Sequence, residues 1–260
     1  MTYFHGLVAA SLLFLLLERA LPAREQRVLR DGWAKDLFYL FFNGHFYALV
    51  FGGVVAAFAA RTRESLAALS LLPEHGLLDG APFALAFVVY LVVSDFLQWC
   101  VHNLLHRLPI LWTFHQVHHS ITTMDWAGNF RFHWVELVVY RSLLYVPLLF
   151  LGGAPEALLA AWVLATAWGH FNHANVRLRL GPLGCVLNSP AMHLWHHDKS
   201  SEGGAFKNYG VVLSLWDFLF GTAYWPRARA PRRLGYPGME RLPDDLARQL
   251  VWPLLPEDAA

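Results

Sequence analysis

Residues 95–120 read DFLQWCVHNLLHRLPILWTFHQVHHS, an apolar stretch that carries five histidines at helical spacing. His102 and His106 are four residues apart, which places both side chains on the same face of an α-helix. The HxxHH sequence at 115–119 places three imidazoles within an arc of about 100° on a helix. The stretch therefore predicts two helical segments that each direct histidines toward one place.

Two further histidine groups follow this stretch. The HxxHH spacing is repeated at 193–197, and His170 and His173 lie three residues apart. Imidazole is a ligand for iron, zinc, copper and nickel, and one tetrahedral zinc needs only three or four protein ligands. Ten clustered histidines exceed that number and predict two metal ions of higher coordination number. The ten candidate ligands are His102, His106, His115, His118, His119, His170, His173, His193, His196 and His197.

The composition of the 260-residue chain indicates a membrane protein. Hydrophobic residues make up 56% of the chain and charged residues 15%, whereas a soluble domain usually carries about 25% charged residues. The net charge of +1 argues against a nucleic-acid partner, which would require a basic patch. The two cysteines, Cys100 and Cys185, can form neither a disulfide framework nor a CxxC metal pair.

Apolar runs along the chain predict its fold. Run 37–60 is long enough to cross about 30 Å of hydrocarbon, and run 3–17 lacks the positive start and the cleavage site of a signal peptide. The five runs are 3–17, 37–60, 83–101, 135–151 and 157–168. We therefore predict an all-α, polytopic membrane bundle of about four to five hydrophobic helices in a single domain, 1–260.

The connections between these runs orient the bundle. Gly-Gly-Ala-Pro at 152–155 joins the last two runs as a tight turn, which predicts a helical hairpin. The first connection carries five Lys or Arg residues and the second carries two, so the positive-inside rule puts the first in the cytoplasm. The histidine-bearing segments after the third and fifth runs then also face the cytoplasm, as a helical cap. The basic residues are mostly Arg, a bias typical of a GC-rich bacterial genome, so we expect a bacterial cytoplasmic membrane.

Several motifs carry a resemblance to a known family. They occur in the expected order between about residues 90 and 225 and are LWTFHQVHHS at 111–120, RFHWVE at 131–136, HANV at 173–176, PAMHLWHH at 190–197, NYG at 208–210 and LWDFLFGT at 215–222. Together with the run that starts at Asp95, they resemble the fatty acid hydroxylase and sterol desaturase superfamily. The N-terminal membrane helices are then 1–82, the catalytic region 83–225 and the polar C-terminal tail 226–260.

The resemblance implies a histidine-ligated di-iron centre that uses O2 to hydroxylate or desaturate a lipid, acyl-chain or sterol-like substrate. All candidate histidines except His170 match the motifs, and His170 is expected as an extra ligand. The sequence does not choose between hydroxylation and desaturation. It carries no GxGxxG fingerprint for a nucleotide cofactor, so a separate ferredoxin, or a cytochrome or reductase, is expected to supply electrons.

Polar residues near the histidines are candidates for orienting the ligands, because a metal-bound imidazole usually donates its other N–H to a carboxylate or carbonyl. Asp95 lies seven residues before His102 on one helical stripe. The same orienting role is open to Asp198, Asn208 and Asp217, and the alternative is that they only fix the loops in which they lie. The main candidates for orienting the ligand histidines are Asp95, Glu136, Asn175 and Asp217.

Glu136 follows His133 by three residues and is expected to orient it or a neighbouring ligand. The alternative for Glu136, and for Asp95, is an ion pair with Arg131 or Arg141. His133 itself stays open as a ligand.

Two other classes of protein compete with the oxygenase. A membrane zinc hydrolase would normally show HExxH, which does not occur in this sequence. A haem electron carrier needs only one or two axial histidines per haem, which would leave the HxxHH groups unexplained. Metal analysis separates these alternatives.

Overall fold

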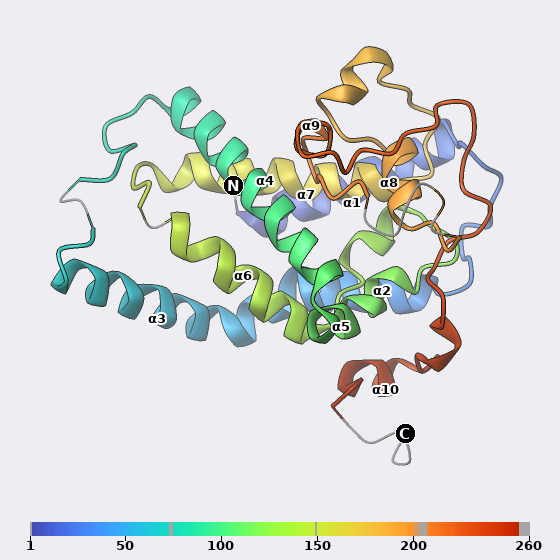
Figure 1. Cartoon of the computed structure of the whole chain (residues 1–260), viewed down its shortest axis with the longest axis horizontal. Coiled ribbons are helices and arrows are strands. Elements are labelled where there is room, and N and C mark those ends of the chain that lie inside the picture. The colour runs from blue at the N-terminus through green and yellow to red at the C-terminus, as the bar shows by residue number, and fades with distance from the viewer. Residues whose placement is uncertain (1, 73–74, 149, 201, 203–206, 255–260) are drawn as a thin grey trace.

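The computed structural model describes residues 2–72, 75–148, 150–200, 202 and 207–254. The described part of the chain contains helices and isolated β-bridges but no strand, which confirms the all-α prediction (Figure 1). The helices are α1 Tyr3–Ala20, α2 Trp33–Phe41, α3 Tyr47–Ala68, α4 Phe83–Arg107, α5 Pro109–His119, α6 Trp134–Leu148, α7 Pro155–His173, α8 Pro190–His196, α9 Leu215–Leu219 and α10 Leu246–Val251.

Two of the described helices, α1 and α4, are long and apolar enough to cross a membrane. Large apolar side chains on these helices and on α3 point outward: Leu16 is 66% exposed, Leu85 54% and Val54 67%. Extended apolar surface of this kind is typical of a face that contacts lipid or a partner. The chain therefore has the surface of a membrane protein, and four to five crossings stay a prediction.

The predicted run 37–60 is not one uninterrupted α-helix. A π-helical turn, Phe42–Phe46, separates α2 from α3. Within it the buried Asn43 side chain donates hydrogen bonds of 2.8 Å to the carbonyls of Phe130 and Phe132. A π turn widens the helix locally, and here it lets a polar side chain join α2 and α3 to the segment between α5 and α6.

Helices α3, α4, α6 and α7 run between two ends of the molecule. At one end, on the left of Figure 1, the α3–α4 connection packs on the α6–α7 turn. The Leu78 amide donates to the Leu151 carbonyl at 2.7 Å, and the Gly153 amide donates to Asp79 at 2.7 Å. A Cβ atom on Gly76 would lie 2.4 Å from the Gly152 Cα, so this approach requires glycine. The histidine-bearing ends of α4, α5, α7 and α8 lie at the other end.

The predicted hairpin of the last two apolar runs is wrong in one respect. The turn forms, with Gly152 and Gly153 at φ 61° and 85°. However, the described parts of α6 and α7 do not pack along one another; each packs against α4 instead. They diverge from the turn, and a cavity lies between them.

A buried ionic network fixes the histidine end. Arg30 donates to Asp36 at 2.5 Å and to Asp125 at 2.7 Å, and Arg131 donates to the other oxygen of Asp36. Arg131 also contacts Ser120, the residue after the last histidine of α5. Because the network joins the first connection, α2, α5 and the segment before α6, it holds segments far apart in sequence together.

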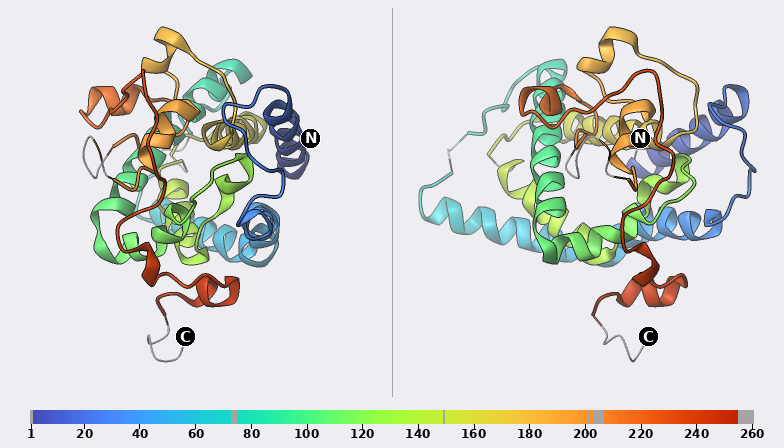
Figure 2. Two further views of the ribbon diagram at one scale, coloured as in Figure 1. Left: turned by 90° about the vertical axis from the view of Figure 1, so that its right-hand side faces the viewer. Right: turned by 45° about the vertical axis from the view of Figure 1, so that its right-hand side comes forward.

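The C-terminal segment lies at one edge of the molecule, as both views of Figure 2 show. It is attached by contacts with α2: Tyr39 donates to Gln249 at 3.4 Å, and Tyr39 packs with Val117 and Leu242. The expected polar tail therefore carries a short helix, α10, that packs on the rest of the chain.

Candidate metal centre

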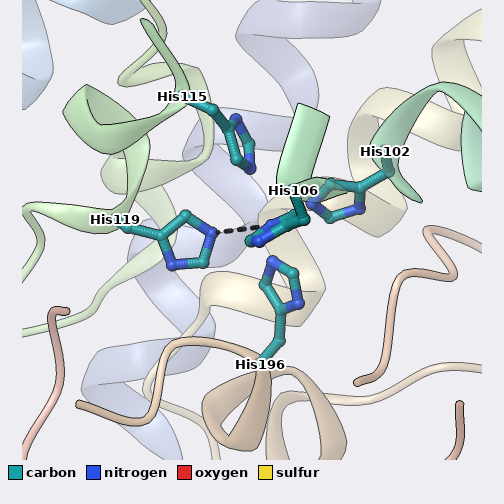
Figure 3. A group of neighbouring side chains, drawn as sticks. All are labelled: His102, His106, His115, His119 and His196. Carbon is teal, nitrogen blue, oxygen red and sulfur yellow. Dashed lines mark hydrogen bonds between the residues drawn. The ribbon is translucent and has the colours of Figure 1, made fainter. Parts of the chain in front are cut away.

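Nine of the ten candidate histidines form two neighbouring groups. Within each group the ligand atoms lie within 4.8 Å of one another. Figure 3 shows the first group, whose rings converge from three helices. The first group is His102, His106, His115, His119 and His196, and the second group is His118, His173, His193 and His197.

Each HxxHH sequence is divided between the two groups. On α5, the residues four apart, His115 and His119, belong to the first group, and the remaining histidine belongs to the second. The second copy is divided in the opposite sense: His193 and His197 belong to the second group and His196 to the first. Residues at i and i+4 share a helical face, whereas i+3 lies to one side of it. The repeated spacing thus places two adjacent groups between the same two segments.

Backbone carbonyls fix two rings of the first group. The Nδ1 atom of His102 lies 2.9 Å from the Tyr209 carbonyl oxygen, and Nδ1 of His196 lies 2.8 Å from the Lys207 carbonyl oxygen. A carbonyl can only accept, so each Nδ1 carries the hydrogen and donates. The lone pair of each ring is then on Nε2, which is the atom directed into the group.

A carboxylate and a helical carbonyl fix two more rings. His115 Nδ1 donates to Glu136 Oε1 at 2.8 Å, and both side chains are buried. In the second group, His173 Nδ1 donates to the Gly169 carbonyl at 2.9 Å. Orientation of a ligand by a partner on its other nitrogen is the usual arrangement around protein-bound metals.

The inward nitrogens have the properties of metal ligands. Nε2 of His102, His115 and His196 is buried and has no hydrogen-bond partner among the described residues. In the second group, Nε2 of His193 lies 3.2 Å from Nε2 of both His173 and His197. Buried polar atoms are normally paired, and one metal ion in each group would pair several of these lone pairs at once.

Burial also keeps the rings outside the membrane-spanning helices in the neutral form that binds metal. Burial lowers the pKa of His118, His119, His196 and His197 well below the usual value, and the neighbouring histidines lower it further. A ligand must be deprotonated to bind. The residues present therefore fit two metal ions held by imidazole.

A cavity of about 400 Å³ adjoins both groups. Its histidine end is lined by His102 and His115 of the first group and by three members of the second. It continues between α6 and α7, where Leu144, Leu159 and Trp162 line it. The volume is in the range of small-molecule sites, about 300–1,000 Å³. A ligand in the cavity would thus touch both groups and an apolar wall.

The comparison with known families agrees with this geometry. Residues 87–222 match the family model described as fatty acid hydroxylase. This chain belongs to the fatty acid hydroxylase family. The matched region contains every residue of both histidine groups.

Several curated relatives are similar to this fatty acid hydroxylase family member. The ornithine lipid hydroxylase OlsE of Rhizobium tropici is 31% identical over 86% of this chain and 67% of its own length. The human alkylglycerol monooxygenase is 31% identical over 49% of this chain, which spans 28% of that protein. The Delta(7)-sterol 5(6)-desaturase erg3B of Aspergillus fumigatus is 26% identical over 63% of this chain and 46% of its own length. No solved structure matches.

His170, expected as a tenth ligand, lies outside both groups. Its ring nitrogens contact the Ser11 hydroxyl at 3.3 Å, the Asn129 amide at 3.3 Å and the Trp126 carbonyl at 3.1 Å. Three residues on, His173 faces the second group. The ring of His170 instead fastens α7 to α1 and to the 3-10 helix Trp126–Phe130.

His133, left open as a ligand, is also outside the groups. Its Nε2 donates to the Leu250 carbonyl at 3.0 Å, and its Nδ1 accepts from the Val135 amide at 3.2 Å. Burial lowers the pKa of His133 to about 4. Both nitrogens are used, so the ring serves to hold the C-terminal segment near the start of α6.

Of the four orienting candidates, only Glu136 contacts a candidate ligand among the described residues, through the bond to His115. Arg131, one of the two alternative partners of Glu136, is bonded to Asp36 instead; a pair with Arg141 stays a prediction. The other three candidates have different roles. Of the two expectations for Glu136, to orient His133 or a neighbouring histidine, the structure shows the second, because its partner is His115 of α5.

Asp95 does not bond to a candidate ligand in the described structure, although it shares α4 with two of them. Its carboxylate accepts from the backbone amides of Val212 and Leu213, at 2.7 and 3.0 Å, and from the Trp216 indole at 2.9 Å. It therefore anchors the loop before α9 to α4. Neither Asp95 nor Asn175 forms an ion pair or hydrogen bond with a ligand histidine in the described structure; Asn175 bonds to the backbone of Arg24 at 3.0 and 2.7 Å.

Asp217 acts on the first group through the backbone. It accepts from the amides of Tyr209 and Gly210, both at 2.8 Å. The carbonyl of Tyr209 is the acceptor for His102. Sequence reasoning missed the Tyr209 and Lys207 carbonyls, since backbone acceptors leave no residue-type pattern. The NYG motif at 208–210 was the only signal for this segment.

Proposed function

We propose that this chain is a membrane-bound, O2-dependent non-haem di-iron oxygenase that hydroxylates or desaturates a lipid. The observation that carries the proposal is the presence of two largely buried groups of five and four histidines that both line one cavity. Membership of the fatty acid hydroxylase family and the printed activities of the relatives, which include ornithine lipid hydroxylase and alkylglycerol monooxygenase, support the reaction class.

The donor set favours two iron ions over one zinc ion. A structural or catalytic zinc takes three or four protein ligands, whereas nine imidazoles converge here. Bound iron would supply, with dioxygen, the oxidising power needed to break an unactivated C–H bond. The protein's own residues hold the ligands neutral, orient them through Glu136 and backbone carbonyls, and bury the site from water.

The cavity favours a lipid as substrate. It leads from the histidines along α6 and α7, whose apolar residues Leu137, Leu144 and Leu159 line it. An acyl chain can lie in such a cavity without losing hydrogen bonds, since both surfaces are apolar. The exposed apolar surface of α1, α3 and α4 would put the cavity at the depth of the membrane.

The electron donor is proposed to be a separate protein, a ferredoxin or a cytochrome or reductase, that docks at the histidine end. The arginine-rich segment 227–233 continues into a backbone contact with that end: the Lys199 amide donates to the Arg233 carbonyl at 2.9 Å. Two residues later, the Gly235 amide donates to the carbonyl of His197, a candidate ligand, at 3.0 Å. Exposed arginines beside the site suit a donor with an acidic face. The positive-inside rule would put this end in the cytoplasm of a bacterium.

Comparative lipid mass spectrometry tests the proposal. Cells with and without the gene are compared, together with cells that express His118→Ala. We expect one lipid class to gain one oxygen atom, if the reaction is hydroxylation, or to lose two hydrogen atoms, if it is desaturation. The new lipid must be absent with His118→Ala. Native product levels with this variant would contradict the proposed site.

A further inference from the structure

One face of α6 lines the cavity from the histidine end toward the membrane interior. The lining residues Glu136, Leu137, Tyr140, Arg141 and Leu144 recur at the spacing of a single helical face. Arg141 is the only Lys or Arg among the described residues that line the cavity. A permanent positive charge is therefore built into a wall that is otherwise largely apolar.

The carboxylate on the same face has a different task. Glu136 Oε1 accepts from His115, so the carboxylate serves the first histidine group. Arg141 lies five residues later, which is about 7.5 Å along the helix axis at 1.5 Å per residue. Arg141 thus lines the same cavity as the histidines and as the apolar residues Leu159 and Trp162.

Other polar side chains accompany Arg141 at this depth. Tyr140 donates to Gln98 of α4 at 3.3 Å, and both residues line the cavity. Gln98 lies one helical turn before His102. A cation and a polar pair on facing helices form a polar belt next to the histidines. Ionisable groups in apolar helices are costly and usually serve a ligand or transport path.

We propose that Arg141 binds an anionic group of the lipid substrate, a carboxylate or a phosphate, within the cavity. Guanidinium is suited to both because its N–H groups form paired, charge-assisted hydrogen bonds with two oxygens. The inference rests on the proposed function and deepens it by naming the substrate class. Because Arg141 lies about one and a half turns from Glu136, the oxidised carbon is close to the anionic group and not at the far end of the acyl chain.

Competition binding tests the anion site without turnover. The purified full chain in phosphatidylcholine nanodiscs is titrated with parinarate, a fluorescent acyl carboxylate. Palmitate, lysophosphatidate and hexadecanol then displace the probe and represent a carboxylate, a phosphate and a neutral chain. We expect Arg141→Gln to weaken the binding of the anionic competitor that the wild type binds more tightly, palmitate or lysophosphatidate. The loss should be about 10- to 100-fold, the usual effect of losing a charged hydrogen bond. Hexadecanol affinity should change by less than about threefold. If the wild type binds palmitate more tightly, the anionic group of the substrate is a carboxylate; if it binds lysophosphatidate more tightly, the group is a phosphate.

Three controls make the result specific. Arg141→Lys keeps the charge and should restore part of the loss, and Arg179→Gln, which removes an exposed arginine outside the cavity, should bind all three competitors like the wild type. Iron content must be equal in all variants, which shows that the site is intact. Unchanged anion binding in Arg141→Gln, or an equal loss for hexadecanol, would overturn the anion site.

Turnover of the same three lipids separates this inference from the proposed function. If Arg141→Gln selectively weakens anion binding but the iron-loaded wild type oxidises none of a broad lipid extract, the anion site stands and the oxygenase proposal fails. If the wild type oxidises neutral and anionic chains equally well and binds them equally, the oxygenase stands and the anion site fails.

Discussion

Replacement of Glu136 by alanine should weaken metal binding in the first histidine group alone. Glu136 is the only carboxylate that accepts from a candidate ligand imidazole in the described structure, and the acceptors on the Nδ1 atoms of His102, His196 and His173 are backbone carbonyls. The variant leaves His115 Nδ1–H buried without an acceptor, which costs about 1–3 kcal/mol. At 1.36 kcal/mol per factor of ten, iron affinity of the first group should fall about 10- to 100-fold, which agrees with other outer partners of metal ligands.

Chelator titration of the iron-loaded protein measures this loss. Glu136→Ala should release one iron per chain at a chelator concentration that leaves the wild type with two, and the second iron should follow the wild-type curve. Glu136→Gln keeps an acceptor oxygen and should lose less than about tenfold. Glu156→Gln removes an exposed carboxylate in the first turn of α7 and serves as the control. Two irons held as tightly in Glu136→Ala as in the wild type would refute the assigned role.

Three further outcomes follow from the contacts. His170→Ala should keep both irons and lower the free energy of unfolding by about 1–3 kcal/mol, whereas His193→Ala should lose iron; equal iron loss would restore His170 as a ligand. Asp36→Asn removes the carboxylate that Arg30 and Arg131 share and should cost about 3–5 kcal/mol in chemical denaturation; a loss under about 1 kcal/mol would contradict the network's role. Burial lowers the pKa of the α5 histidines well below 6.5, so the unfolded chain binds more protons than the folded chain below pH 6.5. Thermal melting of the iron-free protein should therefore show a stability that decreases as the pH is lowered below 6.5. A stability that increases on acidification would contradict this.

The sequence predicts the histidine groups well because helical spacing is a local property. Four-residue and HxxHH spacings put His102 and His106 on one face of α4 and divide the histidines of α5 and α8 between two groups. His170 lies outside both groups because its neighbours are set by tertiary packing: this residue, three positions before His173 on α7, faces α1. Spacing alone cannot say which of two nearby faces meets the other helices.

Long-range polar contacts are the part that the sequence did not predict. Asp95 lies on the helical stripe of His102, yet its oxygens bond to amides more than a hundred positions later. The hairpin prediction was sound at the turn, where Gly152 and Gly153 adopt positive φ, but a local turn does not fix the angle between the helices that follow. The cavity that separates α6 and α7 is a property of the whole bundle.

Metal analysis with an optical spectrum of the purified, full-length protein tests the central claim most directly. Nine imidazoles in two groups, eight of them buried, predict about two irons per chain, with no Soret band. One zinc ion per chain without iron, or a strong Soret band, would contradict the di-iron assignment.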